Sequence, residues 1–455
     1  MPSPTCRGGT PTTSSATWQR LRAGMAFSGG RKLVGLGFGA IQSGLFVYEA
    51  QGTGDYAPPL VVDVRADLVA GLRADGGQLR LNIARAGRID VVEVGPIEVA
   101  DSTQAPDRAR IIEAIAEADE FASALPSVAF YRSEGANSPH LLLAEGLRRR
   151  TAPEPLIVFC AENHRSAAAL LEEAVLEAAP EDEREAIRGR ARYVDTVIGK
   201  MSGVITDTAE MRALGLASIT SALPSAFLVE EFDRILVSRV DPEAGLLHPG
   251  IPVLREVDDL EPFEDAKLLG HNATHALGAF LGQLLGLTLF ADLRDVPGAM
   301  DFLRVAFIEE SGAALRVRHA GADPLFTEVG YEAFADDLLA RMVNPHLADT
   351  IDRAARDPRR KLGWDDRLVG LIRLGRAEGI PMPRYAMGVA AGLDVLRRAG
   401  AGAGSDADLL LAAWPESLDR DEVETVLGVV GEGRGWLEQW HAEGFEGLPE
   451  PTIAG

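Results

Sequence analysis

Three side chains near the middle of the chain, Lys267, Asn272 and His275, could together remove a proton and stabilise the charge left behind. A neutral amine accepts a proton, an amide donates hydrogen bonds to an oxyanion, and an imidazole orients a polar group. At about 100° per residue, Asn272 lies about 140° and His275 about 80° round an α-helix from Lys267. We therefore expect all three side chains on one side of a single helix.

The same stretch allows other interpretations. Taken singly, Lys267 is a solvated lysine at a helix start, Asn272 a surface amide and His275 a core histidine. His271 and His275 are also four residues apart, which is the spacing of zinc ligands on a helix. We predict no metal, because Asn272 stands where the glutamate of a His-Glu-x-x-His motif would be.

Behind these residues, Gly278, Gly282 and Gly286 recur every four positions along the expected helix. Glycine costs about 1 kcal/mol relative to alanine inside a helix, so a repeated glycine indicates a packing reason. We expect another helix to pack closely on this stripe.

A second group of residues, near the start of the chain, has the pattern of a dinucleotide-binding turn. A short apolar strand runs into Gly37 and Gly39, an apolar helix, 45–50, follows, and a second strand ends in Asp63. Glycines let the backbone approach a pyrophosphate, and a helix N-terminus offers free N–H groups to it. Asp63 would accept hydrogen bonds from the ribose diol, which predicts NAD, while Arg65 keeps NADP possible.

This pattern is imperfect, because Gln42 occupies the place of the third glycine, and a structural turn is the alternative. Asn163 follows an apolar strand, 156–160, and so sits where open α/β sheets hold their ligands. The predicted cofactor-binding residues are Gly37, Phe38, Gly39, Ala40, Ile41, Asp63 and Asn163.

The elements that must position these residues form two groups. Strand and helix patterns alternate over 31–258, which predicts an α/β, Rossmann-type domain with a mostly parallel sheet. Within it, 78–99 alternate like a β-hairpin and 106–119 have the apolar spacing of a helix. From 259 to 445, helical patterns replace the strands and predict a mainly α-helical domain.

The ends of the chain carry weaker signals. Residues 1–30 are rich in Ser, Thr, Gly and Pro, and we interpret them as a disordered tail or an over-long start. The glycine-rich link 397–406 is expected to be flexible, and 446–455 to form a loose C-terminus.

Composition narrows the class of protein. The chain has 455 residues, of which 46% are hydrophobic and 25% charged, as in a globular protein with a large core. A net charge of −23 argues against nucleic acid or anionic lipid as a partner. Two cysteines exclude a disulfide scaffold, and no apolar run reaches the roughly 18 residues of a membrane helix. We expect a cytoplasmic protein, monomeric or homodimeric, that acts on a small molecule.

The motifs of the chain, in their order, resemble those of the polyol-specific long-chain dehydrogenases, the mannitol dehydrogenase family. The resemblance covers about residues 30–400 and runs through the glycine turn, the acid after the second strand, Glu-Asn, Val-Asp, Val-Glu-x-Phe and Lys-x4-Asn-x2-His. A final block, from Arg341 to Leu368, contains Asn-Pro-His-Leu-Ala-Asp-Thr. This block and the lysine motif are highly specific.

The resemblance implies a metal-free hydride transfer in a cleft between a Rossmann-type domain and a helical domain. Carried over by motif, Lys267 is the general base, Asn272 and Asn163 steady the oxyanion, and His275 orients the substrate. A lysine can act as a base only if its pKa falls from about 10.4 towards the working pH. Burial and nearby cations such as Arg353 and Lys361 would both lower it.

The same resemblance assigns the substrate site. Arg353 and Lys361 would hold the polyol, and Asp195 matches a substrate-site acid. Arg356 and Arg360 belong to a basic cluster with two interpretations: a surface belt of salt bridges to neighbouring aspartates, or a clamp for a phosphate group. The predicted substrate-binding residues are Asp195, Arg353, Lys361, Arg356 and Arg360.

The expected reaction is the NAD-dependent interconversion of a hexitol phosphate (mannitol 1-phosphate) and a ketose phosphate (fructose 6-phosphate). Departures from the phosphate-specific pattern, at Ala273-Thr274, Thr196 and Glu231, keep two alternatives open, a dehydrogenase of free mannitol and a hexuronate reductase. A non-catalytic, nucleotide-sensing module is the alternative of another class, and the intact lysine, asparagine and histidine argue against it.

Overall fold

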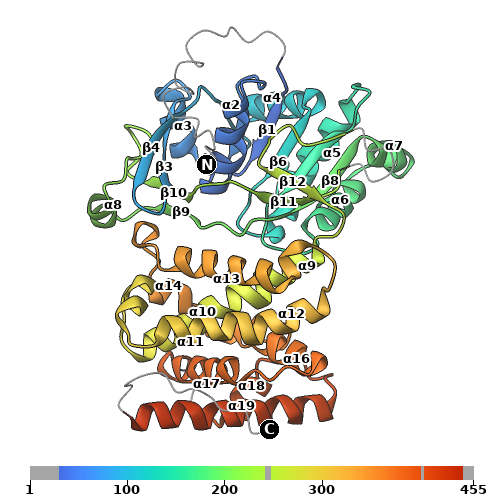
Figure 1. The fold of residues 1–455 in the computed structure, drawn as a ribbon. Helices are drawn as coiled ribbons and strands as arrows, with labels where there is room; N and C mark the ends of the chain where they lie inside the picture. Colours follow the sequence, from blue (N-terminus) through green and yellow to red (C-terminus); the bar gives the residue numbers. More distant parts are fainter. Residues whose placement is uncertain (1–29, 241–246, 401–403, 444–455) are drawn as a thin grey trace, which may run out of the picture. The chain divides into compact units, whose positions relative to one another are not determined.

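The computed structural model describes residues 30–240, 247–400 and 404–443 (Figure 1). The expected tail before residue 30 and the expected loose end at 446–455 lie outside these residues, as does the centre of the glycine-rich link, 401–403. The chain divides into two compact units: the first ends at Asp258 and the second begins at Asp259. The short segment Ala84–Ile89 is grouped with the second unit.

The first unit is built on an eight-stranded sheet, and the expected mostly parallel sheet is confirmed. Six neighbouring strands, from β8 to β5, run parallel, and β11 pairs antiparallel with β8. The strands in spatial order are β12 (Leu254–Val257), β11 (Ile235–Ser238), β8 (Ala191–Val197), β7 (Leu156–Cys160), β6 (Glu120–Ser123), β1 (Leu33–Leu36), β2 (Leu60–Asp63) and β5 (Glu98–Asp101).

The central strands are covered on both faces, which explains their short apolar runs. Every residue of β1, β2, β6 and β7 is buried. The helices of this unit are α2 (Glu49–Thr53), α3 (Ala66–Ala74), α4 (Ala105–Glu117), α5 (Pro139–Arg149), α6 (Ala167–Ala178), α7 (Arg184–Gly189) and α8 (Thr208–Leu214). The expected hydrophobic face of α4 is confirmed, because its buried residues are Ile111, Ile112, Ile115 and Ala116.

A second, four-stranded sheet was not expected from the sequence. Its strands in spatial order are β4 (Ile89–Val94), β3 (Leu79–Ala84), β10 (Ala226–Glu230) and β9 (Ser202–Ile205). The hairpin pattern at 78–99 correctly predicted β3 and β4. The pairing of β3 with β10, a strand more than a hundred residues later in the chain, leaves no mark on local periodicity.

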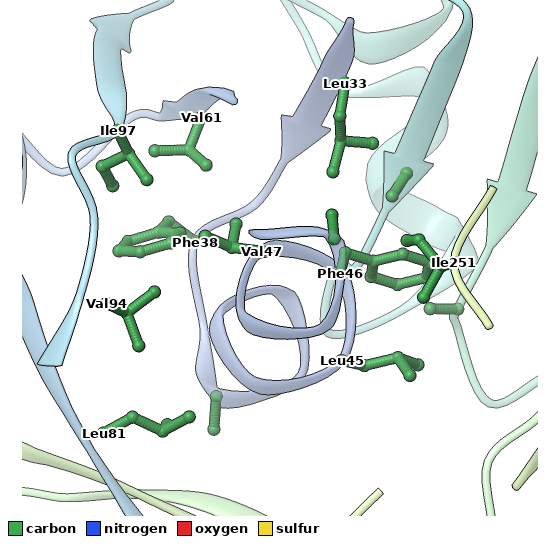
Figure 2. Close-up of a cluster of buried hydrophobic side chains, with 14 of the residues drawn as sticks. Leu33, Phe38, Leu45, Phe46, Val47, Val61, Leu81, Val94, Ile97 and Ile251 are labelled. Carbon is green, nitrogen blue, oxygen red and sulfur yellow. The ribbon is translucent and has the colours of Figure 1, made fainter. Parts of the chain in front are cut away.

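The helix that follows β1 is the centre of the first core. It runs over 40–53 and includes a π-helical turn, Gln42–Tyr48 (η1), so it starts earlier than the expected 45–50. Figure 2 shows Phe38 turned towards Val94 and Ile97 on one side of this helix, and Phe46 towards Ile251 on the other. These core contacts on two sides fix the position of the first turn of the helix after β1.

The second unit is helical, as expected. Its helices are α9 (Glu261–Asp265), η4 (Ala266–His271), α10 (Asn272–Leu284), α11 (Ala299–Val305), η6 (Ala306–Ser311), α12 (Gly312–Arg318), α13 (Glu328–Met342), α14 (Ile351–Ala355), α15 (Pro358–Lys361), α16 (Val369–Glu378), α17 (Pro383–Arg398), α18 (Asp406–Leu411) and α19 (Arg420–Ala442). α17 packs on both α10 and α19. Among the helices of the described ranges, none combines the length and apolar character needed to span a membrane.

The glycine stripe on α10 serves packing at two of its three positions. A Cβ at Gly278 would lie 2.7 Å from the Phe290 ring, and one at Gly282 would lie 2.6 Å from Ile351. Gly286 does not belong to the stripe: its φ of +71° ends the helix, and a Cβ there would meet nothing within 4 Å. The four-residue repeat therefore predicted the packing correctly but not the helix end.

Candidate active site

Lys267 lies in a π-helical turn, not in the regular α-helix that the spacing suggested. The backbone N–H of Asn272 donates to the carbonyl oxygen of Lys267, five residues back. This wider turn brings the two side chains closer to one line along the helix than the expected separation of about 140°. Single π-turns inside α-helices occur often at functional sites, so this irregularity fits a chemical role for Lys267.

The residues around the π-turn satisfy the carbonyl groups that the irregular turn frees. The Ser311 hydroxyl, at the end of η6, donates to the Leu269 carbonyl oxygen at 3.1 Å. The Thr274 hydroxyl lies 2.9 Å from the Gly270 carbonyl oxygen and 2.7 Å from the Tyr385 hydroxyl. These buried hydrogen bonds fix the turn that carries the lysine.

Burial lowers the pKa of Lys267 to about 8. Glu264 opposes this fall and the Arg367 guanidinium adds to it. We expected Arg353 and Lys361 to be the cations responsible, so this part of the prediction was wrong. With a pKa of about 8, a sizeable fraction of the amine is neutral near physiological pH and can act as a general base.

His275 is held by the carboxylate of Asp349, which lies shortly before the basic cluster in the chain. Its Nε2 lies 2.7 Å from Oδ2 of Asp349, and its ring lies 4.6 Å from the ring of Phe290. The neighbouring His271 has a pKa well below its usual value, first because it is buried and then because of His275 and Arg341. The part of the chain that the structure describes contains no cluster of three or more metal-ligating side chains.

The predicted substrate-binding cations have different surroundings. Arg353 donates to Oδ1 of Asp349 from Nε at 3.0 Å and from Nη2 at 2.6 Å. Lys361 is buried, and its Nζ donates to the carbonyl oxygens of Ala354 and Arg356, both at 2.5 Å. Two of the three ammonium protons of Lys361 therefore stabilise the C-terminal end of α14. Burial first, and the charge of Arg367 second, lower the pKa of Lys361 to about 8.

The basic cluster around Arg360 is partly a salt-bridge belt. Arg360 pairs with Asp357 at 3.0 Å and with Asp366 at 3.2 Å, and Arg367 also pairs with Asp366. Arg356 is exposed, and its side chain forms no ion pair with the residues that the structure describes. The belt interpretation therefore holds for Arg360, while Arg356 stays a candidate for a phosphate contact.

The glycine turn after β1 fits a dinucleotide. β1 lies between β2 and β6, where the strand order reverses, and ligands of such sheets bind at this point. Gly37 has a φ of +80°, and a Cβ there would lie 2.9 Å from the Ala124 carbonyl oxygen. A Cβ at Gly39 would meet nothing within 4 Å. The turn thus demands glycine at one position and leaves open space above the other, as a backbone approach to a phosphate requires.

The turn is completed by Phe38, Ala40 and Ile41, whose side chains are buried or partly buried. Phe38 is buried with its ring edge-on to Phe227, at 5.6 Å between ring centres, and Ala40 and Ile41 begin the helix. Their side chains anchor the turn in the core, which leaves the backbone as the part that could meet a ligand.

Gly35 in β1 compensates for Gln42, which replaces the third glycine of the motif. The Gln42 side chain is fully buried and lies over Gly35, where a Cβ would be only 2.2 Å from Nε2. The close contact between helix and strand that a third glycine normally allows is here made possible by the glycine of the strand.

Asp63 is more closely bound to the protein than a simple ribose ligand would be. Its Oδ2 accepts a hydrogen bond from the Phe38 backbone N–H at 2.8 Å, and its Oδ1 accepts from Arg65 Nε at 3.0 Å. Arg65 also donates to the Phe38 carbonyl oxygen at 2.7 Å. Asp63 therefore fixes the glycine turn. Together with the Arg65 backbone N–H and Nη2, its carboxylate accepts four hydrogen bonds within the protein, so a ribose hydroxyl would have to replace one of them.

Asn163 and Asp195 lie at the ends of neighbouring strands. Cys160 of β7 pairs in register with Asp195 of β8, and Asn163 follows three residues after Cys160. Asp195 accepts a hydrogen bond from the Ala168 N–H at 2.8 Å, at the start of α6, and burial raises its pKa. The buried Glu162 beside Asn163 accepts from the Ser123 hydroxyl at 2.6 Å and so ties the loop to β6.

Three positioning residues were missed: Glu162, Asp349 and Arg367. Glu162 lies in the Glu-Asn motif and Asp349 in the Asn-Pro-His-Leu-Ala-Asp-Thr block, so only their contacts could reveal their part. Two of the departures from the family pattern prove to be internal, since Ala273 and Thr274 are fully buried.

Comparison with known proteins identifies relatives of the chain. Two family models match the chain, the mannitol dehydrogenase Rossmann domain over residues 31–246 and the mannitol dehydrogenase C-terminal domain over residues 259–404. Mannitol-1-phosphate 5-dehydrogenase of Aspergillus niger is 24% identical over 75% of this chain and 80% of its own length. The Bacillus licheniformis enzyme of that name is 29% identical over 70% and 76%. A match to the Aspergillus terreus enzyme, at 30% identity, spans about half of both chains, 50% and 54%.

Solved structures share the fold. D-sorbitol dehydrogenase in substrate-free form matches with a TM-score of 0.71 and 16% identity, over 92% of this chain and 96% of that one. Pseudomonas fluorescens mannitol 2-dehydrogenase, in a ternary complex with NAD and D-mannitol, matches with a TM-score of 0.65 and 15% identity, over 91% and 92%. Because the two family models cover most of the chain in the expected order, the chain belongs to the mannitol dehydrogenase family.

Proposed function

We propose that this protein is a cytoplasmic, NAD-dependent polyol dehydrogenase that interconverts mannitol 1-phosphate and fructose 6-phosphate, with Lys267 as general base. The observation that carries the proposal is the lysine in its π-turn, with a pKa lowered to about 8. Family membership and the names of the relatives support the polyol as substrate. The NAD of the mannitol 2-dehydrogenase complex and the Rossmann family model support the cofactor.

In this mechanism the cofactor would be held by the glycine turn and Asp63. Bound NAD supplies the acceptor for a hydride from the hydroxyl-bearing carbon. Lys267, neutral above a pH of about 8, takes the hydroxyl proton as the hydride leaves. In the reverse direction the ammonium returns the proton to the ketose oxygen.

Charge that develops on the substrate oxygen needs fixed donors. Asn272 is the nearest candidate, because its backbone is hydrogen-bonded to Lys267 across the π-turn. Its side-chain amide forms no hydrogen bond within the described ranges and is available as a donor. Asn163 is the second predicted donor, and His275 and Arg353 would orient the hydroxyl groups of the polyol.

The first test is a substrate comparison followed through NADH absorbance. We expect the oxidation of mannitol 1-phosphate to have a higher kcat/KM than that of free mannitol, and tagaturonate not to consume NADH. Faster turnover of mannitol or of tagaturonate would replace the proposed substrate by that compound. Binding of NAD without turnover of any of the three would favour a nucleotide-sensing module.

The second test addresses the base. Lys267→Ala should abolish turnover while the dissociation constant for NAD, measured by calorimetry, stays nearly unchanged. Turnover near the wild-type rate would reject the role of Lys267.

A further inference from the structure

We propose that Asp349 is a positioning residue, which sets the tautomer of His275 and holds the guanidinium of Arg353 with the same carboxylate. The inference rests on the proposed function, in which His275 and Arg353 orient the polyol. Among the described residues, Asp349 forms hydrogen bonds with His275, Arg353 and the Phe290 backbone, and so acts on the substrate through His275 and Arg353.

The two oxygens of the Asp349 carboxylate are used separately. Oδ2 lies 2.7 Å from Nε2 of His275, while Oδ1 accepts two hydrogen bonds from Arg353, at 3.0 and 2.6 Å. The Asp349 side chain is 1% exposed, against 18% for His275 and 49% for Arg353. The carboxylate is therefore the buried support, and the two groups it holds are the ones that water or a substrate can reach.

The charge of the Asp349 carboxylate decides which group donates in its hydrogen bond with His275. An ionised carboxylate can only accept, so the neutral imidazole must carry its proton on Nε2. Burial would raise the pKa of Asp349, but the hydrogen bond from His275 and the charge of Arg353 outweigh it, and the pKa is lowered. The Nδ1 atom then keeps a lone pair, which could accept a hydrogen bond from a substrate hydroxyl.

The backbone holds Asp349 in place. The residue before it, Ala348, has a φ of +47°, a left-handed conformation that alanine rarely adopts. The Asp349 carbonyl oxygen accepts from the Phe290 N–H at 2.8 Å, and the Phe290 ring lies on His275. Strained residues persist only where their surroundings determine them, and here the strain directly precedes the carboxylate.

The variant Asp349→Asn tests the proposal, because the amide has the shape of the carboxylate but can donate to Nε2. Long-range ¹⁵N–¹H spectra of histidine-labelled protein without substrate, assigned with His275→Gln, report the tautomer at a pH where the ring is neutral. We expect the Nε2–H form in the wild type and the Nδ1–H form in Asp349→Asn. Kinetically, we expect kcat/KM for the polyol to fall at least tenfold, with NAD affinity unchanged.

Asp352→Asn is the matched control, since Asp352 lies three residues further on, in the first turn of α14, is exposed and accepts a hydrogen bond from Gln283 Nε2 at 3.1 Å. It should keep both the tautomer and the rate. An Nδ1–H tautomer in the wild type would overturn the proposal even if Asp349→Asn fails to fold. Loss of activity in Asp349→Asn with an unchanged tautomer would also overturn it, because the role would then be structural. Absence of polyol turnover in the wild type would reject the proposed function but leave the tautomer result standing.

Discussion

At the scale of the single residue, the burial that lowers the pKa of Lys267 also lowers the stability of the folded protein. Its pKa falls from 10.5 to about 8 because it is buried, and a fall of this size corresponds to roughly 3 kcal/mol. The ammonium is disfavoured in the folded state, so the cost is fully present below pH 8. It disappears as the pH rises towards 10.5, where the unfolded lysine also loses its proton.

Lys267→Met should therefore raise the free energy of unfolding by about 2–3 kcal/mol at pH 7, because a neutral chain of similar shape replaces a buried charge. The gain should shrink between pH 8 and pH 10, as measured by denaturant unfolding. Lys32→Met is the control: Lys32 is exposed and pairs with Glu117 at 2.7 Å, so its loss should change stability by less than about 1 kcal/mol. Equal stability of Lys267→Met and wild type at pH 7 would show that the amine is not strained.

At the same scale, a substitution of Arg356 tests whether this residue binds the phosphate group of the substrate. Its exposed guanidinium forms no ion pair with the described residues, and neither does that of Arg359, three residues on. Loss of a charged hydrogen bond costs about 1.5–3 kcal/mol, so Arg356→Ala should raise KM for mannitol 1-phosphate at least tenfold and leave KM for mannitol unchanged. Arg359→Ala should change neither value. Equal effects of the two variants would point to general electrostatic attraction instead of a clamp.

At the scale of the element, the helix after β1 tests the compensation between Gln42 and Gly35. A Cβ on Gly35 would lie 2.2 Å from Gln42 Nε2, so Gly35→Ala should destabilise the protein by about 1–3 kcal/mol. Gln42→Gly should remove most of this penalty in the double variant, because the helix then contributes the glycine. Calorimetric unfolding of the two single variants and the double variant measures the coupling. Simple additivity of the two effects would contradict the contact.

The limits of sequence analysis also appear at this scale. Alternation and apolar spacing predicted β7, α4 and the hairpin, because each of these patterns is local. The π-turn at Lys267 was not predicted, since it depends on hydroxyl groups from Thr274 and Ser311, the latter about forty residues away. The role of Asp349 was missed for the same reason, because its partner His275 is 74 residues distant in sequence.

At the scale of the whole molecule, the two units divide the task. The first unit holds the glycine turn, Asp63 and Asn163, and the second holds Lys267, His275 and the basic cluster. The order of these motifs along the chain predicts the family from the sequence alone, without any contact between residues. The oligomeric state, monomer or homodimer, stays a prediction from the sequence, as does the cytoplasm as its location.

The most direct test of the whole account is the pH dependence of kcat/KM for polyol oxidation, measured between pH 6 and pH 10. A substrate deuterated at the carbon that loses the hydride slows hydride transfer, so that the chemical step contributes more to the measured rate. If the amine at position 267 takes the proton, kcat/KM should fall about tenfold per pH unit below a pH of about 8 and stay level above it. A rate that does not change with pH across this range would contradict the assignment of Lys267 as the base.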